Sequence, residues 1–220
     1  MVDRDKVGVT IPIPLPKEHI FRNQAMDDIL GLLYENPYDE FSIRELRKIT
    51  GHGGQTVSDS IERFQKLGVI EIRWEGKKKL ISIDQRFVQK PDDPYMKIPQ
   101  EEFRTPVRRF IEKVEALGNN LLGVLVFGSV ARGDADRRSD IDIFVLVRED
   151  LLQSRRKVQE MRREIEEERF EGDRYEFQVM VESLESAEDY GEKLKEIFLE
   201  GITLEETEEF RKLRRGVLRG

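Results

Sequence analysis

Apolar residues recur every three or four positions in three stretches between residues 22 and 67, which is the pattern of amphipathic helices. We expect helices over residues 22–34, from Ser42 to near Gly51, and over residues 55–67. Ser42 and Glu45 have the spacing of a capping box, and Gly68 is placed to end the third helix. Two stretches of alternating polarity follow, VIEIRW and KLISI. The pattern therefore predicts three helices and then a hairpin.

The second half of the chain has a different order of elements. Residues 89–100, QKPDDPYMKIPQ, hold three prolines and no periodicity, so we expect a linker there. Thr105 and Pro106 are placed to begin a helix that runs to Gly118. We expect a buried strand over 121–127, a helix over 151–170 and a strand over 174–181. These elements predict an α+β fold in two domains.

The order of three helices and a basic hairpin is that of a winged helix-turn-helix. Within it, TVSDSIERFQKLGVIEI resembles the recognition helix and the start of the wing in MarR-like and ArsR-like regulators. The resemblance covers about residues 20–88 and implies a winged helix-turn-helix domain there. We expect an extended, proline-containing arm over residues 1–19, the linker over 89–100 and a second domain over 101–220.

Charge is unevenly spread along the chain. The formal net charge is −7, but residues 41–90 carry 11 basic and 6 acidic side chains. A basic helix-turn-helix indicates duplex DNA as a partner. The candidate DNA contacts are Gln55, Thr56, Ser58 and Ser60 for bases and Lys77, Lys78 and Lys79 for phosphates. Asp59 argues against DNA, because a carboxylate near phosphates is unfavourable, so a winged helix that docks a protein is the alternative.

Composition excludes several kinds of site and location. The chain has no cysteine and two histidines, which excludes disulfides and thiolate or histidine zinc sites. Its longest apolar run, LLGVLVF, is too short to span a bilayer, and the N-terminus lacks the apolar core of a signal peptide. We therefore expect a soluble cytoplasmic protein without a membrane partner. A homodimer is left open.

The stretch GSVARGDADRRSDIDIFVLV, residues 128–147, carries the candidate chemistry. Its Gly-Ser turn follows the predicted buried strand. Gly128 allows a phosphate to approach the backbone, and the Ser129 hydroxyl can bond phosphate oxygens. Arg132, one turn along, adds positive charge. This combination predicts a phosphate-binding turn.

Two aspartates follow the turn. Residues two apart in a strand share a face and are about 6.6 Å apart, so Asp140 and Asp142 project the same way while Ile141 and Ile143 point into a core. Carboxylates held side by side repel, and cations between them relieve the repulsion. Hard oxygen ligands of this kind suit Mg²⁺. An acidic surface strand is the alternative for an isolated pair.

The composite motif FGSVARGDADRRSDIDIFVLV resembles the signature of the polymerase-β nucleotidyltransferase superfamily, especially its minimal nucleotidyltransferases. The resemblance implies a nucleotidyltransferase α/β domain with a small mixed sheet. It also implies that Gly128 and Ser129 bind the phosphates of ATP or another nucleoside triphosphate. Asp140 and Asp142 would bind Mg²⁺ or Mn²⁺. The chain is thus expected to be a nucleotidyltransferase.

The family also carries a third carboxylate on a later strand, where it helps the nucleophile to lose its proton. In RYEFQVMV, residues 174–181, one face is apolar and the other carries Glu176 and Gln178. Glu176 is our candidate for the third catalytic and metal-binding carboxylate. The family usually has aspartate there, so this longer side chain is a departure. An ordinary exposed glutamate is the alternative.

The resemblance implies two classes of function. Minimal nucleotidyltransferases often act as antitoxins that transfer AMP to a HEPN-type toxin, and others modify small molecules. The first hypothesis is therefore an enzyme that transfers a nucleotide to a protein or small-molecule acceptor, with the winged helix targeting or regulating it. The second is a transcription regulator whose nucleotidyltransferase domain only senses a nucleotide. A functional Glu176 would favour the enzyme.

Overall fold

The structure is a computed structural model that describes residue 21 and residues 23–87, 93–188 and 191–219. The predicted arm over residues 1–19 lies outside the described residues. So do residues 89–92 of the predicted linker.

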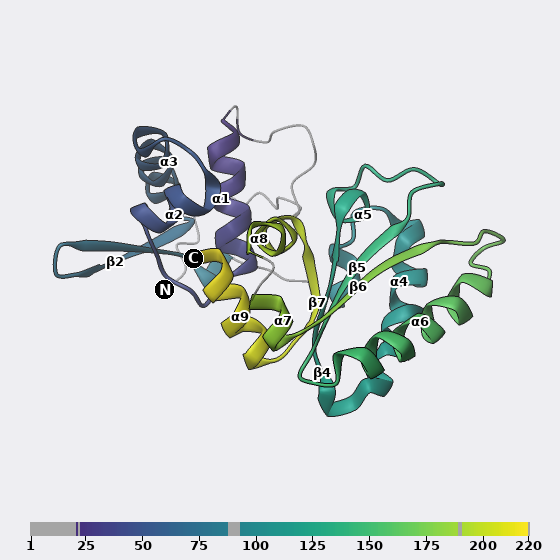
Figure 1. Cartoon of the computed structure of the whole chain (residues 1–220). Coiled ribbons are helices and arrows are strands. Elements are labelled where there is room, and N and C mark those ends of the chain that lie inside the picture. Colours follow the sequence, from purple (N-terminus) through teal and green to yellow (C-terminus); the bar gives the residue numbers. More distant parts are fainter. Residues whose placement is uncertain (1–20, 22, 88–92, 189–190, 220) are drawn as a thin grey trace.

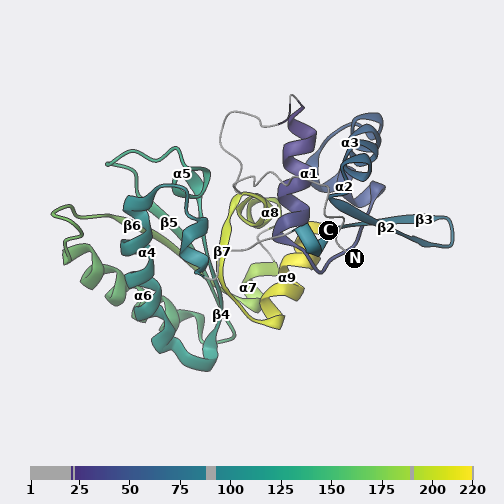
Figure 2. The same ribbon diagram turned by 180° about the vertical axis from the view of Figure 1, so that it is seen from behind.

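The N-terminal elements are three helices and a small antiparallel sheet. They are α1 (Gln24–Glu35), β1 (Phe41–Ser42), α2 (Ile43–Thr50), α3 (Gly54–Leu67), β2 (Ile70–Glu75) and β3 (Lys78–Ile83). The strand order is β1-β3-β2, and the β2–β3 hairpin projects from the body of the molecule (Figures 1 and 2). The predicted helices and hairpin are confirmed as elements. Their assignment to a winged helix stays a prediction.

Local sequence explains where these helices begin and end. The Ser42 hydroxyl accepts from the Glu45 N–H, and the Glu45 carboxylate accepts from the Ser42 N–H at 2.8 Å, which confirms the capping box. Gly51 and Gly68 end α2 and α3 in the left-handed conformation, each with φ of 73°. Glycine adopts this conformation without a steric penalty, so each helix ends where the sequence predicted.

The remaining elements form a mixed sheet with helices on both faces. They are η1 (Gln85–Phe87), η2 (Pro94–Lys97), α4 (Glu101–Val114), η3 (Glu115–Asn120), β4 (Leu121–Phe127), α5 (Gly128–Arg132), β5 (Ile141–Val147), α6 (Leu151–Glu167), β6 (Phe177–Ser183), α7 (Leu184–Glu188), α8 (Gly191–Glu200), β7 (Ile202–Glu206) and α9 (Glu208–Arg219). The strand order is β6-β5-β4-β7, with β5 and β6 parallel and the other pairs antiparallel. The α+β class and the small mixed sheet agree with the prediction.

Each face of this sheet buries its own set of side chains. Ile141 and Ile143 of β5 pack in one cluster with residues of α4 and α6. Phe144, on the opposite face, packs in a second cluster with residues of α8 and α9. Figure 1 shows the same layers, with α4 and α6 on one side and α7–α9 on the other. The expected inward direction of both isoleucines is confirmed.

The helix predicted to begin at Pro106 begins five residues earlier. α4 starts at Glu101, and Pro106 lies inside it. The apolar stripe extends upstream to Phe103, which is buried against Tyr175. A proline removes one helical hydrogen bond, and the burial of Phe103 offsets that loss. The helix also ends earlier than predicted, because residues 115–120 form η3 and not a continuation to Gly118.

The end of the predicted linker is packed against the sheet domain. Asp93 caps η2 by accepting from the Tyr95 N–H at 3.0 Å. Tyr95 and Ile98 are buried in the same cluster as α4. Lys97 donates to the Thr203 carbonyl of β7 at 3.3 Å. Residues 93–100 therefore belong to the body of the molecule, and the domain boundary stays a prediction.

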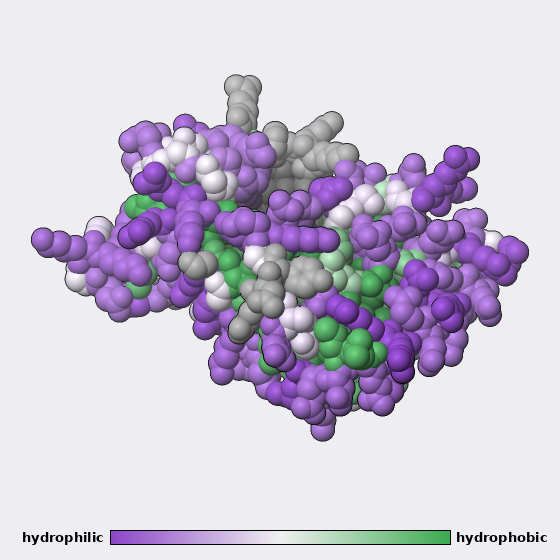
Figure 3. All heavy atoms as spheres, viewed as in Figure 1, coloured by the Kyte–Doolittle hydropathy of each residue, from purple (hydrophilic) through white to green (hydrophobic). Residues whose placement is uncertain are grey.

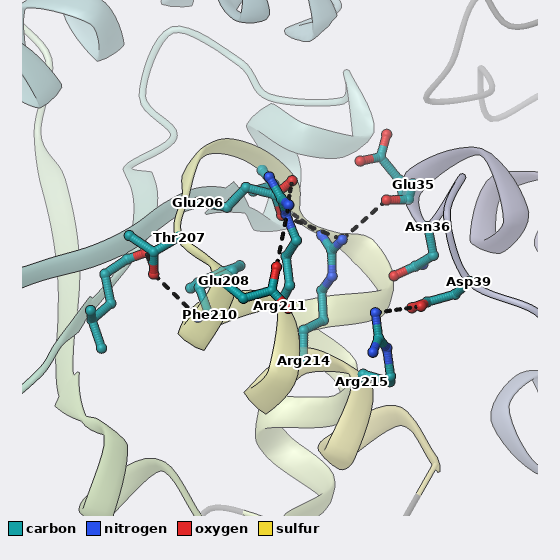
Figure 4. A network of polar contacts seen from close by, with 12 residues as sticks. Glu35, Asn36, Asp39, Glu206, Thr207, Glu208, Phe210, Arg211, Arg214 and Arg215 are labelled. Carbon is teal, nitrogen blue, oxygen red and sulfur yellow. Dashed lines mark hydrogen bonds and ion pairs between the residues drawn. The ribbon is translucent and has the colours of Figure 1, made fainter. Parts of the chain in front are cut away.

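The last helix, α9, joins the sheet to the N-terminal elements (Figure 4). Arg214 is buried; it donates to Oγ1 of Thr203 at 2.8 Å and to the carbonyl of Glu35 at 3.1 Å. Arg215 forms an ion pair of 2.6 Å with Asp39. One hydrophobic cluster extends from α1–α3 to α8 and α9.

Figure 3 shows the surface of the molecule from the same side as Figure 1. On this side, hydrophobic residues show mainly in the middle, and the projecting hairpin is largely hydrophilic.

Candidate active site

The site begins where β4 ends. Phe127, the last residue of β4, lies opposite Asp142 of β5 in the antiparallel ladder. The next residue, Gly128, has φ of 68°, and a Cβ atom there would overlap Oδ2 of Asp142. Glycine adopts this backbone conformation without strain and leaves the Asp142 carboxylate in place. The strand pairing therefore sets the predicted phosphate-binding turn directly beside the second aspartate.

The turn leads into the short helix α5. Gly128 and Ser129 are half-buried, and no side chain caps the start of the helix. The first N–H groups of a helix have no partner within the helix. These N–H groups and the Ser129 hydroxyl are donors suited to phosphate oxygens. The local geometry fits the predicted role of both residues.

Asp140 and Asp142 lie where the alternation of a strand predicts. Asp140 is exposed just before β5, and Asp142 is half-buried within it. Burial, and then the charge of Asp140, raise the pKa of Asp142 above its ordinary value, and the charge of Arg132 opposes the shift only in part. The ionised form of Asp142 is therefore disfavoured in the folded protein, and a bound cation would stabilise it.

Arg132 lies at the end of α5 between carboxylates. Its NH1 donates to Oε2 of Glu200 at 2.7 Å, and its Nε lies 3.6 Å from Oδ2 of Asp134. Burial disfavours its charged form, but the hydrogen bond to Glu200 and the charges of both carboxylates outweigh burial and raise the pKa of Arg132. The guanidinium is a fixed positive charge beside the turn.

The predicted third carboxylate does not join the acidic pair. Glu176 is exposed and precedes β6, and its carbonyl accepts from the Ile141 N–H at 2.9 Å. Within the part of the chain that the structure describes, no three His, Asp or Glu side chains lie close enough to hold a metal ion. The expected three-carboxylate metal site is therefore not assembled here.

The register between β5 and β6 determines which residues lie beside the acidic pair. Ile141 lies opposite Phe177, and Asp142 lies opposite Gln178. Residues paired across parallel strands point to the same face, so the neighbour of Asp142 is a neutral amide. Glu176 is instead level with Asp140 at the start of the strand. Sequence alone does not give this register, so it did not show that Gln178, and not Glu176, lies directly beside Asp142.

The acidic pair nevertheless suits a divalent cation. Its donors are carboxylate oxygens, the ligands that Mg²⁺ and Mn²⁺ prefer. Mg²⁺ is commonly bound by one or two carboxylates together with substrate phosphates and water. Asp140 and Asp142 would hold the ion, and substrate phosphates bound at the adjacent Gly128 turn would be its other ligands.

The candidate DNA contacts are not equally available. Ser60 is fully buried and donates to the carbonyl of Thr56 at 2.8 Å, so its prediction as a base contact is wrong: it faces the core side of α3. Gln55 is exposed, but its amide donates to Asp59 at 2.7 Å. Thr56 and Ser58 are partly exposed.

The three lysines lie on the projecting hairpin. Lys77 and Lys78 are exposed, and Lys79 is half-exposed opposite Trp74. Lys78 lies 3.9 Å from Glu45. These lysines are thus accessible to a partner.

None of the helices that the structure describes is long and apolar enough to cross a membrane.

The close approach at Gly128 gives a testable result. Gly128→Ala is expected to weaken Mg·ATP binding by about tenfold or more, because its Cβ would displace the Asp142 carboxylate proposed to hold the ion. Gly51→Ala is the matched control, because Gly51 has a similar φ of 73° but open space around it. Isothermal titration calorimetry measures both. Equal ATP affinities in the two variants would contradict the assigned geometry.

One family model matches part of the chain. Residues 107–204 match the family model described as "Nucleotidyltransferase domain", a range that includes the turn, the acidic pair, Glu176 and Glu200. This match supports a transferase of nucleotidyl type. No curated protein matches the chain.

One solved structure is described as "Crystal structure of the toxin-antitoxin with AMP-PNP". It is 22% identical to this chain and has a TM-score of 0.36, and the match covers 50% of this chain and 82% of that one. A TM-score at this level does not establish a common fold.

Proposed function

We propose that this protein transfers a nucleoside monophosphate, AMP from ATP, to a protein or small-molecule acceptor. One observation carries the proposal: the pairing of Phe127 with Asp142 places a turn with hydrogen-bond donors for phosphate beside the acidic pair. Neither feature alone indicates a reaction. Together they supply the two parts that nucleotidyl transfer needs, a seat for a triphosphate and ligands for a divalent cation. The family-model match supports the same reaction class.

The roles of the residues follow from their chemistry. An acceptor oxygen attacks the α-phosphorus, the bond from that phosphorus to the bridging oxygen breaks, and pyrophosphate leaves. The amides of the Gly128 turn and the Ser129 hydroxyl donate to phosphate oxygens, and Arg132 adds positive charge. Asp140 and Asp142 would hold Mg²⁺ or Mn²⁺. When bound, such an ion neutralises charge on the phosphates and lowers the pKa of an attacking oxygen.

Glu176 is the candidate to accept the acceptor's proton. Its position level with Asp140 puts it at the same end of β5 as the acidic pair. Because it is exposed, it is accessible to an acceptor that arrives from solvent. Its long side chain would have to swing toward the acidic pair when the acceptor binds.

Labelled ATP separates an enzyme from a nucleotide sensor. With Mg²⁺ and candidate acceptors, label on the α-phosphate should move to the acceptor, and label on the γ-phosphate should leave as pyrophosphate. Glu176→Gln should keep ATP affinity and lower transfer by about a hundredfold, the scale of a lost general base. Transfer that is indifferent to this change would exclude Glu176. Intact ATP binding without transfer to any acceptor would favour the sensor-regulator.

Candidate acceptors include proteins encoded beside this one and small molecules. The prediction of a HEPN-type toxin as partner derives from the resemblance of the motif to minimal nucleotidyltransferases. Incubation with the product of the neighbouring gene tests it. A labelled neighbour would support an antitoxin-like role, and a labelled small molecule would support a modifying enzyme.

We propose duplex DNA as the partner of the N-terminal elements. The exposed lysines of the projecting hairpin support this proposal, together with the helix pair α2–α3 beside it. The protein-docking alternative is supported by Asp59, which accepts a hydrogen bond from the Gln55 amide and places a carboxylate on the exposed side of α3. With Ser60 buried, the remaining base contacts would be Gln55, Thr56 and Ser58.

Replacing Lys77, Lys78 and Lys79 with alanine separates these alternatives. Each phosphate contact contributes about 0.9 to the slope of log affinity against log salt, so the slope should fall by up to about 2.7. A variant with alanine at three exposed basic positions of α6 removes the same charge elsewhere and should change the slope little; the positions are Arg156, Lys157 and Arg163. Fluorescence anisotropy with duplex DNA measures both. A wild-type protein that binds no DNA at low salt would favour protein docking.

A further inference from the structure

The arginine beside the phosphate turn is held by a residue from a distant element. Arg132 ends α5 and Glu200 ends α8, 68 positions later, and their side chains meet at 2.7 Å. Asp134 contacts the same guanidinium at Nε. A guanidinium has five N–H groups, so these contacts leave donors for a further anion.

The main chain fixes Glu200 relative to the turn. A Cβ atom on the next residue, Gly201, would lie 2.6 Å from the Ile197 carbonyl oxygen and 2.6 Å from a methyl group of Leu125. A glycine is therefore needed where the chain leaves α8 and passes close to β4. It then enters β7, where Ile202 pairs with Val126 of β4. The same strand, β4, carries the Gly128 turn at its end, so the turn and Glu200 share one rigid support.

From this geometry we infer that Glu200 is a positioning residue, which holds the Arg132 guanidinium in place for the phosphates of a nucleoside triphosphate at the Gly128 turn. The inference rests on the proposed function, because it needs a triphosphate at that turn. Glu200 would thus act through the Arg132 side chain and not on the reacting atoms.

Two effects of Glu200 oppose each other. Its negative charge repels phosphates, and its hydrogen bond removes rotational freedom from the long arginine side chain. Both side chains are close to half exposed, 45% for Arg132 and 48% for Glu200, so solvent screens the repulsion. The ordering of Arg132 does not depend on long-range charge. The ordering effect therefore dominates, and Glu200 strengthens triphosphate binding.

A double-mutant cycle on Mg·ATP affinity tests the inference. Arg132→Ala should weaken binding about tenfold, as expected for one charged hydrogen-bond donor. Glu200→Ala should weaken it about threefold, within the range of an exposed ion pair, and should have no effect when Arg132 is already alanine. Glu200→Gln keeps an oxygen that accepts from NH1 and should restore most of the affinity. Glu192→Ala, an exposed carboxylate on the same helix, is the control and should bind as wild type.

Each outcome decides a separate point. Tighter ATP binding by Glu200→Ala would show that repulsion dominates and would overturn the inference. An equal loss with and without Arg132 would show a general structural role and would also overturn it. If wild type binds Mg·ATP and Glu200→Ala binds equally well, the inference fails while the proposed function stands. If wild type binds no nucleotide, the proposed function itself fails.

Discussion

Changing Asp140 and Asp142 together to asparagine is expected to reduce nucleotide transfer by about a thousandfold or more, because a bound metal ion contributes several kcal/mol to such reactions. Asparagine keeps the size of aspartate but removes the charge that a divalent cation requires. Binding of ATP should lose its dependence on Mg²⁺. Label transfer and calorimetry with and without Mg²⁺ measure the two effects.

The same double change should not lower the stability of the folded protein in the absence of metal. Burial and the charge of Asp140 raise the pKa of Asp142, so its ionised form disfavours the folded state. This destabilisation begins as the pH rises through the ordinary aspartate pKa and is complete above the raised one. At neutral pH without metal, the double variant should therefore have an equal or higher free energy of unfolding than wild type.

Asp136→Asn is the matched control in the same loop. The backbone N–H of Arg138, and then the Ser139 hydroxyl, lower the pKa of Asp136, so its ionised form favours folding. That contribution is present above the ordinary aspartate pKa and is lost as the pH falls through the lowered one. Asp136→Asn should lower stability at neutral pH and change transfer little. A double variant of the acidic pair that loses stability as well as activity would mean that the pair supports the fold and not a cation.

Arg214→Ala is expected to lower the free energy of unfolding by about 3–5 kcal/mol, the usual loss when one partner of a buried charged network is removed. Arg214 is 6% exposed, and its guanidinium donates to Oγ1 of Thr203. It also contacts the Glu35 carbonyl and the Glu206 carboxylate (Figure 4). Without it, the Glu35 carbonyl and the Thr203 hydroxyl lose their donor at the junction of α9 with α1 and β7.

Arg211→Ala, one turn earlier on α9, is the control for this change. Arg211 contacts Glu206 at 3.1 Å, but its side chain is 43% exposed, so its loss should lower stability by at most about 1 kcal/mol. Urea unfolding monitored by circular dichroism compares the two variants. Equal small losses would contradict a structural role for the buried network between the N-terminal elements and the sheet.

Local patterns predicted the helices and strands well because their causes are local. The capping box of Ser42 and the glycines at 51 and 68 act within one helical turn. Pro106 misled the prediction of α4, because the burial of Phe103 is a tertiary effect that extends the helix past a signal for its start. Tyr95 and Ile98 are similar: a proline-rich segment reads as a linker, although the sheet domain provides a surface that buries both side chains.

The candidate site was predictable only in part. Gly128, Ser129, Asp140 and Asp142 lie on one continuous stretch, so strand alternation and turn chemistry located them. The position of Glu176 relative to the acidic pair depends on the register of β6 against β5, which is set by packing between segments far apart in the sequence. Ser60 follows Val57 by three residues and precedes Phe64 by four, so helical spacing already places it on the buried stripe of α3 and could have excluded it as a base contact. Glu200 reaches the turn only through the folded chain.

A crystal structure with a non-hydrolysable ATP analogue and Mn²⁺ tests the central claim most directly. Anomalous scattering at the manganese edge should give a peak between the carboxylates of Asp140 and Asp142. The triphosphate should contact the backbone N–H groups of the Gly128–Ser129 turn. A nucleotide bound elsewhere, or a fully occupied nucleotide at the turn with no manganese beside the acidic pair, would contradict the account.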